Sequence, residues 1–465
     1  FYDITSHAVI VWAAGLTLSG ICLAYILFPP RDKLWPVQSA VLAVLAAGGL
    51  LALYANAARS EVRLLVYEYS SISRSNLQVI EEFLDLGHSW ENEAQATEPP
   101  RVKMEQPVEN PAFQAVGGNR PLIVFVVIDA CRPDHMGIYG YERMTTPNLK
   151  RYEHLFVRFN NAVSQATATS CSMRHFFTGH YSSRFMLKTR GIGPFFINNL
   201  IDAGYDKLHL NIIGSDYNGI SALAFLRDMP PELLARVRYY CADEQNEKEA
   251  IDSFTEERLK NTPFASEPEI QLVSGTDQND CKKVRSLLQY LDSLALPGGT
   301  IPASGLFAYV HMTASHFPWR KREAGTWYGK TETDLYDHNI SFCDSASGEL
   351  LDGLRERGLL DDAILIFTAD HGTGLNEHGR YGGFNPYIEQ INVPLLIHIP
   401  GIPAREEPEL VALFDIAPTL VVPFFPEYAD NFDGISLWPL LTEHRTQPDR
   451  VIFGLNSFAD SYFLI

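Results

Sequence analysis

Four apolar runs of strand length are the feature that most constrains the fold of this chain. They cover residues 122–128, 306–310, 363–367 and 393–399, and helix-like stretches separate them. Continuous apolar strands that alternate with helices are typical of a parallel sheet whose two faces are both covered. We therefore predict an α/β fold for residues 120–465, with a mainly parallel sheet sandwiched by helices.

Three of these runs lead into residues that bind metal ions well. Asp129 follows the first run, His311 ends the second, and Asp370 and His371 follow the third. The carboxyl ends of parallel strands meet at one edge of a sheet, where α/β proteins place their chemistry. Divalent metal sites take oxygen and nitrogen ligands from separate strands. We therefore expect Asp129, Asp370 and His371 to share one metal ion.

The first 58 residues differ from the rest of the chain because they contain two long uncharged, apolar runs. Residues 8–28 and 34–58 contain no charged side chain, and each run is long enough to cross about 30 Å of hydrocarbon as a helix. We predict two transmembrane helices within residues 1–58. Residues 59–119 follow as an amphipathic helix and a polar linker, and the catalytic domain would lie outside the cytoplasm.

Charge and cysteine content narrow the possible partners. The net charge of −19 argues against nucleic acid, because phosphate binding needs clustered Lys and Arg. The six cysteines show no zinc-finger spacing. Cys241 and Cys281 flank a polar segment and are the favoured pair if a disulfide forms.

Several segments together resemble one known superfamily. They occur in order along residues 120–445, and they are Val126–His135, Gly140–Leu149, Thr368–Gly372, Asn376–Gly379, Asp415–Thr419 and Asp433–Leu441. The set resembles the alkaline-phosphatase/sulfatase superfamily, and most closely its membrane-anchored phosphoethanolamine (phosphoglycerol) transferases. The resemblance implies a catalytic domain on the periplasmic side of a bacterial inner membrane.

The nucleophile implied by this resemblance is Thr169. It precedes Thr178-Gly179 at the family's spacing, within a segment similar to that of the transferases. In that family Asp129, Thr169, Asp370 and His371 would bind one zinc ion, with a second zinc possible. Zinc makes the alkoxide of a poorly nucleophilic hydroxyl accessible near neutral pH. Ser170 is the alternative nucleophile, and a helix-capping role is the alternative for Thr169.

Three histidines are the expected substrate contacts. His311 and His316 resemble the His-x-x-x-Ser-His-x-Pro segment of the transferases, and His378 lies in a Glu-His-Gly sequence. Two positions depart from the transferase pattern: Thr373 replaces the usual Glu, and Gly383 replaces a further His.

The resemblance implies a zinc-dependent transfer reaction. A phosphoethanolamine-type or phosphoglycerol group would pass from a membrane phospholipid, through a phosphorylated Thr169, to a glycan or glycolipid acceptor. Two alternatives stay open. One is a hydrolase, either a sulfatase or a phosphodiesterase. The other is a catalytically silent, membrane-tethered protein that binds lipid or regulates other proteins.

Overall fold

The computed structural model describes part of the chain. The described residues are 120–181, 196–205, 207–213, 237–241, 270–275, 279–295, 305–379, 381–382, 386–443, 450–456 and 461–465. The predicted transmembrane helices, the amphipathic helix and the polar linker lie outside them. No helix among these residues combines the length and the apolar character needed to cross a bilayer.

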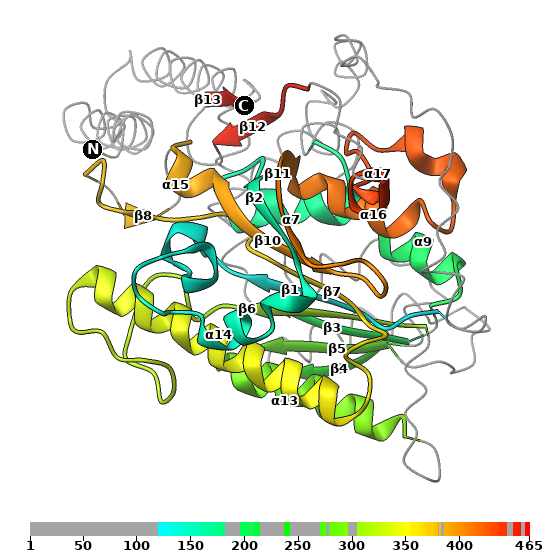
Figure 1. Ribbon diagram of the computed structural model, residues 1–465, viewed down its shortest axis with the longest axis horizontal. Helices are drawn as coiled ribbons and strands as arrows, with labels where there is room; N and C mark the ends of the chain where they lie inside the picture. The colour runs from blue at the N-terminus through cyan, green and yellow to red at the C-terminus, as the bar shows by residue number, and fades with distance from the viewer. Residues whose placement is uncertain are drawn as a thin grey trace, which may run out of the picture. The chain divides into compact units, whose positions relative to one another are not determined.

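A nine-stranded sheet forms the centre of the described part (Figure 1). Its spatial order is β11-β2-β10-β7-β1-β6-β3-β5-β4. The strands are β1 (Ile123–Ile128), β2 (Val157–Val163), β3 (Lys207–Ile213), β4 (Val237–Cys241), β5 (Ile270–Gly275), β6 (Leu306–Met312), β7 (Ile364–Thr368), β10 (Asn392–His398) and β11 (Arg405–Ala412).

The predicted mainly parallel sheet is confirmed, with one difference. The strands expected from the four apolar runs are β1, β6, β7 and β10. β1 pairs in parallel with both β6 and β7, whereas β10 runs antiparallel to both β7 and β2. An apolar run indicates that a strand is buried but does not indicate the direction of the strand. The sequence alone therefore did not predict that β10 is antiparallel.

Helices cover the two faces of the sheet. Figure 1 shows α13 and α14 on one side, and α7, α9 and α16 on the other. The α-helices are α6 (Pro147–Arg151), α7 (Thr169–Thr178), α9 (Phe196–Asp202), α13 (Asp280–Ser293), α14 (Glu332–Glu356), α15 (Ile388–Ile391), α16 (Ile416–Val421) and α17 (Trp438–Glu443). Two small antiparallel pairs complete the set: β8 (Gly374–Leu375) with β9 (Tyr381–Gly382), and β12 (Phe453–Asn456) with β13 (Ser461–Leu464).

The central strand β1 is fully apolar because both faces of the sheet are covered. All six side chains of β1 are buried. On the α7 side, the Phe125 ring lies 5.3 Å from Phe176 and 5.6 Å from Tyr309, both in edge-to-face contact. This packing fixes α7 against the strands that carry Asp129 and His311.

The expected Cys241–Cys281 pairing is wrong. Cys281 is a free thiol buried in the first turn of α13. Burial raises the pKa of this thiol to about 11, so it is a packed neutral group at physiological pH.

Candidate metal and nucleophile site

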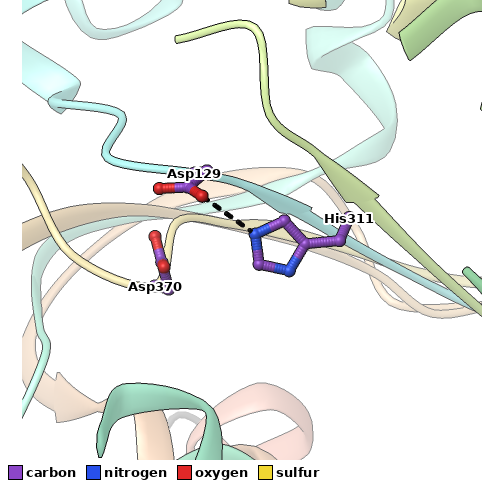
Figure 2. Close-up of side chains that lie close together, drawn as sticks. All are labelled: Asp129, His311 and Asp370. Atoms are coloured by element: carbon purple, nitrogen blue, oxygen red, sulfur yellow. Dashed lines mark ion pairs between the residues drawn. The ribbon is translucent and has the colours of Figure 1, made fainter. Parts of the chain in front are cut away.

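Three neighbouring strands deliver three buried metal-binding side chains to one edge of the sheet. Asp129 follows β1, His311 lies near the end of β6, and Asp370 follows β7, in the spatial order β7-β1-β6. Each offers a ligand atom within 4.8 Å of the other two. Figure 2 shows the three side chains pointing toward one another, with His311 Nε2 lying 3.4 Å from Asp129 Oδ2.

Three polar atoms at the centre of this cluster have no hydrogen-bond partner among the described residues, although His311 Nε2 faces Asp129 Oδ2 at 3.4 Å. These atoms are Asp129 Oδ1, Asp370 Oδ2 and His311 Nε2. A buried polar group without a partner costs about 1–3 kcal/mol, and a native protein rarely places several together. A divalent cation satisfies two carboxylates and an imidazole at once, so the donor set fits a metal ion such as Zn²⁺.

The Asp370 carboxylate is held in one orientation. Its Oδ1 accepts backbone N–H groups from Ala130 and His371, both at 2.9 Å. Ala130 donates from a left-handed conformation with φ of 56°, which is costly for a residue other than glycine. The Tyr336 hydroxyl donates to Ala130 O at 2.8 Å and secures this turn. Oδ2 is thereby left facing the cluster.

Asp129 is ionised within a group of histidines. Burial opposes its charge, but the fields of His316, His311 and His371 outweigh burial and lower the Asp129 pKa to about 2. Ser315 also donates its hydroxyl to the Asp129 carbonyl at 2.6 Å. The site is therefore a permanent anion surrounded by imidazoles.

Thr169 lies beside this cluster and does not cap its own helix. It is the first residue of α7, whose N-cap residue is Ala168, and it is buried. Its Oγ1 lies 3.1 Å from His371 Nε2. His371 Nδ1 lies 2.7 Å from the Gly372 carbonyl, which only accepts, so Nδ1 carries the proton. With Nδ1 turned to its own main chain, Nε2 is the ring nitrogen that faces the Thr169 hydroxyl.

Direct hydrogen bonds connect the nucleophile helix to the metal-binding loop. The Ser172 hydroxyl donates to the Asp370 carbonyl, and Ser164 Oγ lies 3.0 Å from Ser172 Oγ. Ser164 N–H in turn donates to Ile391 O at 2.8 Å. The start of α7 and the loop after β7 are therefore one connected unit.

The structure brings together most of the residues predicted for the site. Thr169, His371 and Asp370 are linked through close contacts, and Asp129 faces Asp370. His311, expected to bind substrate, lies among the carboxylates instead. His316 is half-buried and close enough to Asp129 to lower its pKa.

His378 lies apart from the carboxylate cluster in its described contacts. Its side chain is 44% exposed, it stacks on Tyr387 with ring centroids 3.6 Å apart, and it pairs with Glu389 at 3.2 Å. Its predicted role in substrate binding stays a prediction. Gly383 and the side chain of Ser170 lie outside the described part of the structure.

Two residues near the site escaped the sequence analysis. The Tyr309 hydroxyl lies 2.6 Å from His311 Nδ1. Arg132 donates to the Thr373 carbonyl at 3.2 Å and forms ion pairs with Asp134 and Glu377, joining the turn after β1 to the loop after β7. Tyr309 precedes His311 by two strand positions and so shares its face of the sheet, which is the signal that the sequence offered.

Comparison with known proteins identifies relatives of this architecture. The model of the family described as Sulfatase matches residues 121–422. Arylsulfatase K of Canis lupus familiaris is 28% identical over 160 residues, 34% of this chain and 30% of that protein. Choline-sulfatase of Rhizobium meliloti (strain 1021) is 35% identical over 117 residues, 24% of this chain and 23% of that protein. The matches thus span less than a third of these curated relatives.

A solved structure supports the fold. The C-terminal periplasmic domain of EcEptC from Escherichia coli, in complex with Zn, has a TM-score of 0.51 at 16% identity. The match covers 79% of this chain and 96% of that domain.

Proposed function

The chain belongs to the Sulfatase family, and we propose that it is a metal-dependent phosphotransferase. In this proposal a phosphoethanolamine-type or phosphoglycerol group moves from a membrane phospholipid to a glycan or glycolipid. The observation that carries the proposal is the Thr169 hydroxyl, which is buried and lies 3.1 Å from His371 Nε2 at the edge of the carboxylate cluster.

The residues that would hold the metal ion are Asp129, Asp370 and His311, whose ligand atoms lie within 4.8 Å of one another, together with the neighbouring His371 and Thr169. When bound, Zn²⁺ lowers the pKa of a coordinated hydroxyl and stabilises charge on phosphoryl oxygens. Asp370 Oδ2 and Asp129 Oδ1 are the buried acceptors that such an ion satisfies. A histidine binds a metal ion through an unprotonated ring nitrogen, and His371 has Nε2 available because Nδ1 contacts the Gly372 carbonyl.

The proposed reaction has two displacements. Thr169 Oγ attacks the phosphorus of the lipid diester, an Oγ–P bond forms, and the bond from phosphorus to the diacylglycerol oxygen breaks. The Thr169 hydroxyl gives up its proton as Oγ attacks, and the diacylglycerol oxygen takes up a proton as it leaves. His316, the half-buried imidazole beside the cluster, is the group that would relay this proton. An acceptor hydroxyl then attacks the phosphorus, the Oγ–P bond breaks, and the acceptor's proton restores the Thr169 hydroxyl.

The location and partners belong to the same proposal. A phospholipid donor is reached most directly from a membrane, which fits the two uncharged runs at residues 8–28 and 34–58. We therefore propose a bacterial inner-membrane protein whose catalytic domain is periplasmic and whose acceptor is a glycan or glycolipid.

Replacement of Thr169 tests this function. We expect Thr169→Ala to abolish transfer from a head-group-labelled phospholipid, while Ser170→Ala retains it. Mass spectrometry of the quenched wild-type reaction is expected to place the labelled group on Thr169. Retained turnover in Thr169→Ala, or a label on Ser170 only, would contradict the nucleophile assignment.

A hydrolase is the second candidate, because the curated relatives carry sulfatase names. In a sulfatase the nucleophile is a Ser or Cys converted to formylglycine. Mass spectrometry that finds Ser170 or Cys171 so modified, together with water serving as the acceptor, would favour this candidate over the transferase.

A further inference from the structure

We propose that Asp280 and Lys283, an ion pair in the first turn of α13, form a clamp that positions the site histidines His311 and His316. Asp280 is fully buried, and Lys283 is nearly so. Neither is among the residues that face the carboxylate cluster. The inference rests on the proposed metal site, because it concerns how ligands of that site are held.

The Asp280 carboxylate binds the backbone between the two histidines. Its Oδ1 accepts the Thr313 N–H at 2.9 Å, and its Oδ2 accepts the Ala314 N–H at 3.0 Å. These two donors lie just after β6, beyond the residues that pair with β1 and β3. A charged acceptor from α13 thus replaces the strand ladder at this point.

The Lys283 ammonium binds the same segment from the other end of the pair. Its Nζ donates to His311 O at 2.8 Å and to Thr313 Oγ1 at 2.9 Å, and it lies 3.1 Å from Asp280 Oδ1. An ammonium has three donors, and three acceptors surround this one. Lys283 is therefore occupied in fixing the His311 main chain.

The clamp completes a chain of contacts that ends at Asp129. β6 reaches the site through Met312, whose carbonyl accepts the Asp129 N–H at 2.8 Å. Two residues after Thr313, the Ser315 hydroxyl donates to the Asp129 carbonyl at 2.6 Å. His316 N–H then donates to Thr313 O at 3.2 Å. Because Asp280 holds Thr313, the backbone positions of His311 and His316 are fixed relative to Asp129.

Stability alone is a poor explanation for this pair. A buried ion pair loses much of its attraction to desolvation, and well-packed apolar residues often serve the fold equally well. The desolvation cost of the Asp280–Lys283 pair is offset if the pair fixes a backbone geometry that apolar side chains cannot fix. A clamp on the backbone between two functional histidines is such a geometry.

The test compares metal binding in clamp variants of the full chain. The double variant Asp280→Asn/Lys283→Met removes both charges, so it leaves no single buried charge behind. We expect Zn²⁺ affinity, measured by competition with a chromophoric chelator, to fall about 10- to 100-fold. The visible absorption of the Co²⁺-substituted protein is expected to change, and kcat is expected to fall more than KM rises.

Two further variants make the result interpretable. Arg285→Met/Glu349→Gln removes an exposed ion pair between α13 and α14 and is expected to leave Zn²⁺ affinity and the Co²⁺ spectrum unchanged. Thr313→Val removes only one acceptor of Lys283 and is expected to weaken Zn²⁺ binding by a smaller factor, so it serves if the double variant does not fold.

The outcomes separate this inference from the proposed function. A clamp variant that folds and binds Zn²⁺ as wild type does, with an unchanged Co²⁺ spectrum, overturns the clamp and leaves the function standing. If Thr313→Val is the only variant that folds, an unchanged Zn²⁺ affinity in that variant also overturns the clamp. A wild-type chain that binds no Zn²⁺ overturns the proposed function and the clamp together.

Discussion

At the scale of single residues, the chemistry depends on which ring nitrogen of each histidine carries a proton. The Tyr309 hydroxyl lies 2.6 Å from His311 Nδ1 in a fully buried position. Burial and the charges of Asp370 and Asp129 raise the Tyr309 pKa well above its usual value, so the phenol keeps its proton. The phenol can donate to Nδ1 or accept from it, and in either case the contact fixes the His311 ring with Nε2 directed toward Asp129.

Tyr309→Phe therefore tests the outer support of the site. The change removes the partner of His311 Nδ1, and we expect Zn²⁺ affinity to fall about 10-fold or more. Tyr205→Phe is the matched control, because the Tyr205 hydroxyl is buried and has no hydrogen-bond partner among the residues that the structure describes. Chelator competition on both proteins gives the comparison. Equal loss in the two variants would show that packing, not the hydrogen bond, explains the effect.

At the scale of secondary-structure elements, side chains from one element often satisfy the ends of another. Asp344 of α14 accepts the backbone N–H groups of Asn148 at 2.8 Å and Leu149 at 2.9 Å. Both belong to the first turn of the short helix α6, whose own N-cap residue makes no capping hydrogen bond with its side chain. A helix too short to be stable alone is thus fixed by its neighbour.

Asp344 also gives the protein a pH-dependent stability. Burial raises its pKa to about 6, against about 3.9 in an unfolded chain. Between these values the folded state binds a proton that the unfolded state does not, so this group's contribution falls as pH rises from about 4 to about 6. The total change is about 3 kcal/mol.

We expect the free energy of unfolding of Asp344→Asn, relative to that of wild type, to increase as the pH rises from about 4 to about 6. Urea unfolding at several pH values measures the difference. Asp352→Asn on the same helix is the control, because hydrogen bonds from Tyr152 and Arg151 outweigh burial and lower the Asp352 pKa. A difference in stability between wild type and the Asp344→Asn variant that does not vary with pH would contradict the prediction.

Much of the central sheet could be predicted from sequence, because buried strands appear as unbroken apolar runs. The site residues Asp129, Asp370 and His371 followed from their places at strand ends, and Thr169 from a resemblance. The roles of Asp280 and Lys283 could not be predicted in this way. They lie on a helix far from the strand ends in sequence, and only the packing of α13 beside β6 brings them to Thr313.

At the scale of the whole molecule, the site places uncompensated polar atoms in the middle of the fold. Asp129 Oδ1, Asp370 Oδ2 and His311 Nε2 are buried and make no hydrogen bond within the described part of the structure, so the folded chain without metal carries their desolvation cost. A ligand that binds only the folded state stabilises it by mass action.

Zn²⁺ should therefore raise the stability of this protein. At a free concentration about 100-fold above Kd, we expect a gain of about 2.7 kcal/mol, seen as a higher melting temperature than in excess EDTA. Asp129→Asn is expected to lose most of this gain, whereas Asp292→Asn, an exposed partner of Arg357, is expected to keep it. A melting temperature that is the same with Zn²⁺ and with EDTA would contradict the metal assignment.

The adjacency of β7, β1 and β6 has a consequence for how this protein can diversify. Because β7, β1 and β6 are direct neighbours, the inter-strand spacing of about 4.8 Å and the short turns that follow β1 and β7 together set the width of the candidate metal site. Surface segments farther from the site can therefore change in length or composition without moving the residues that would bind the metal ion. Such an arrangement lets new substrates be acquired by exchanging peripheral segments, with the reactive centre inherited unaltered.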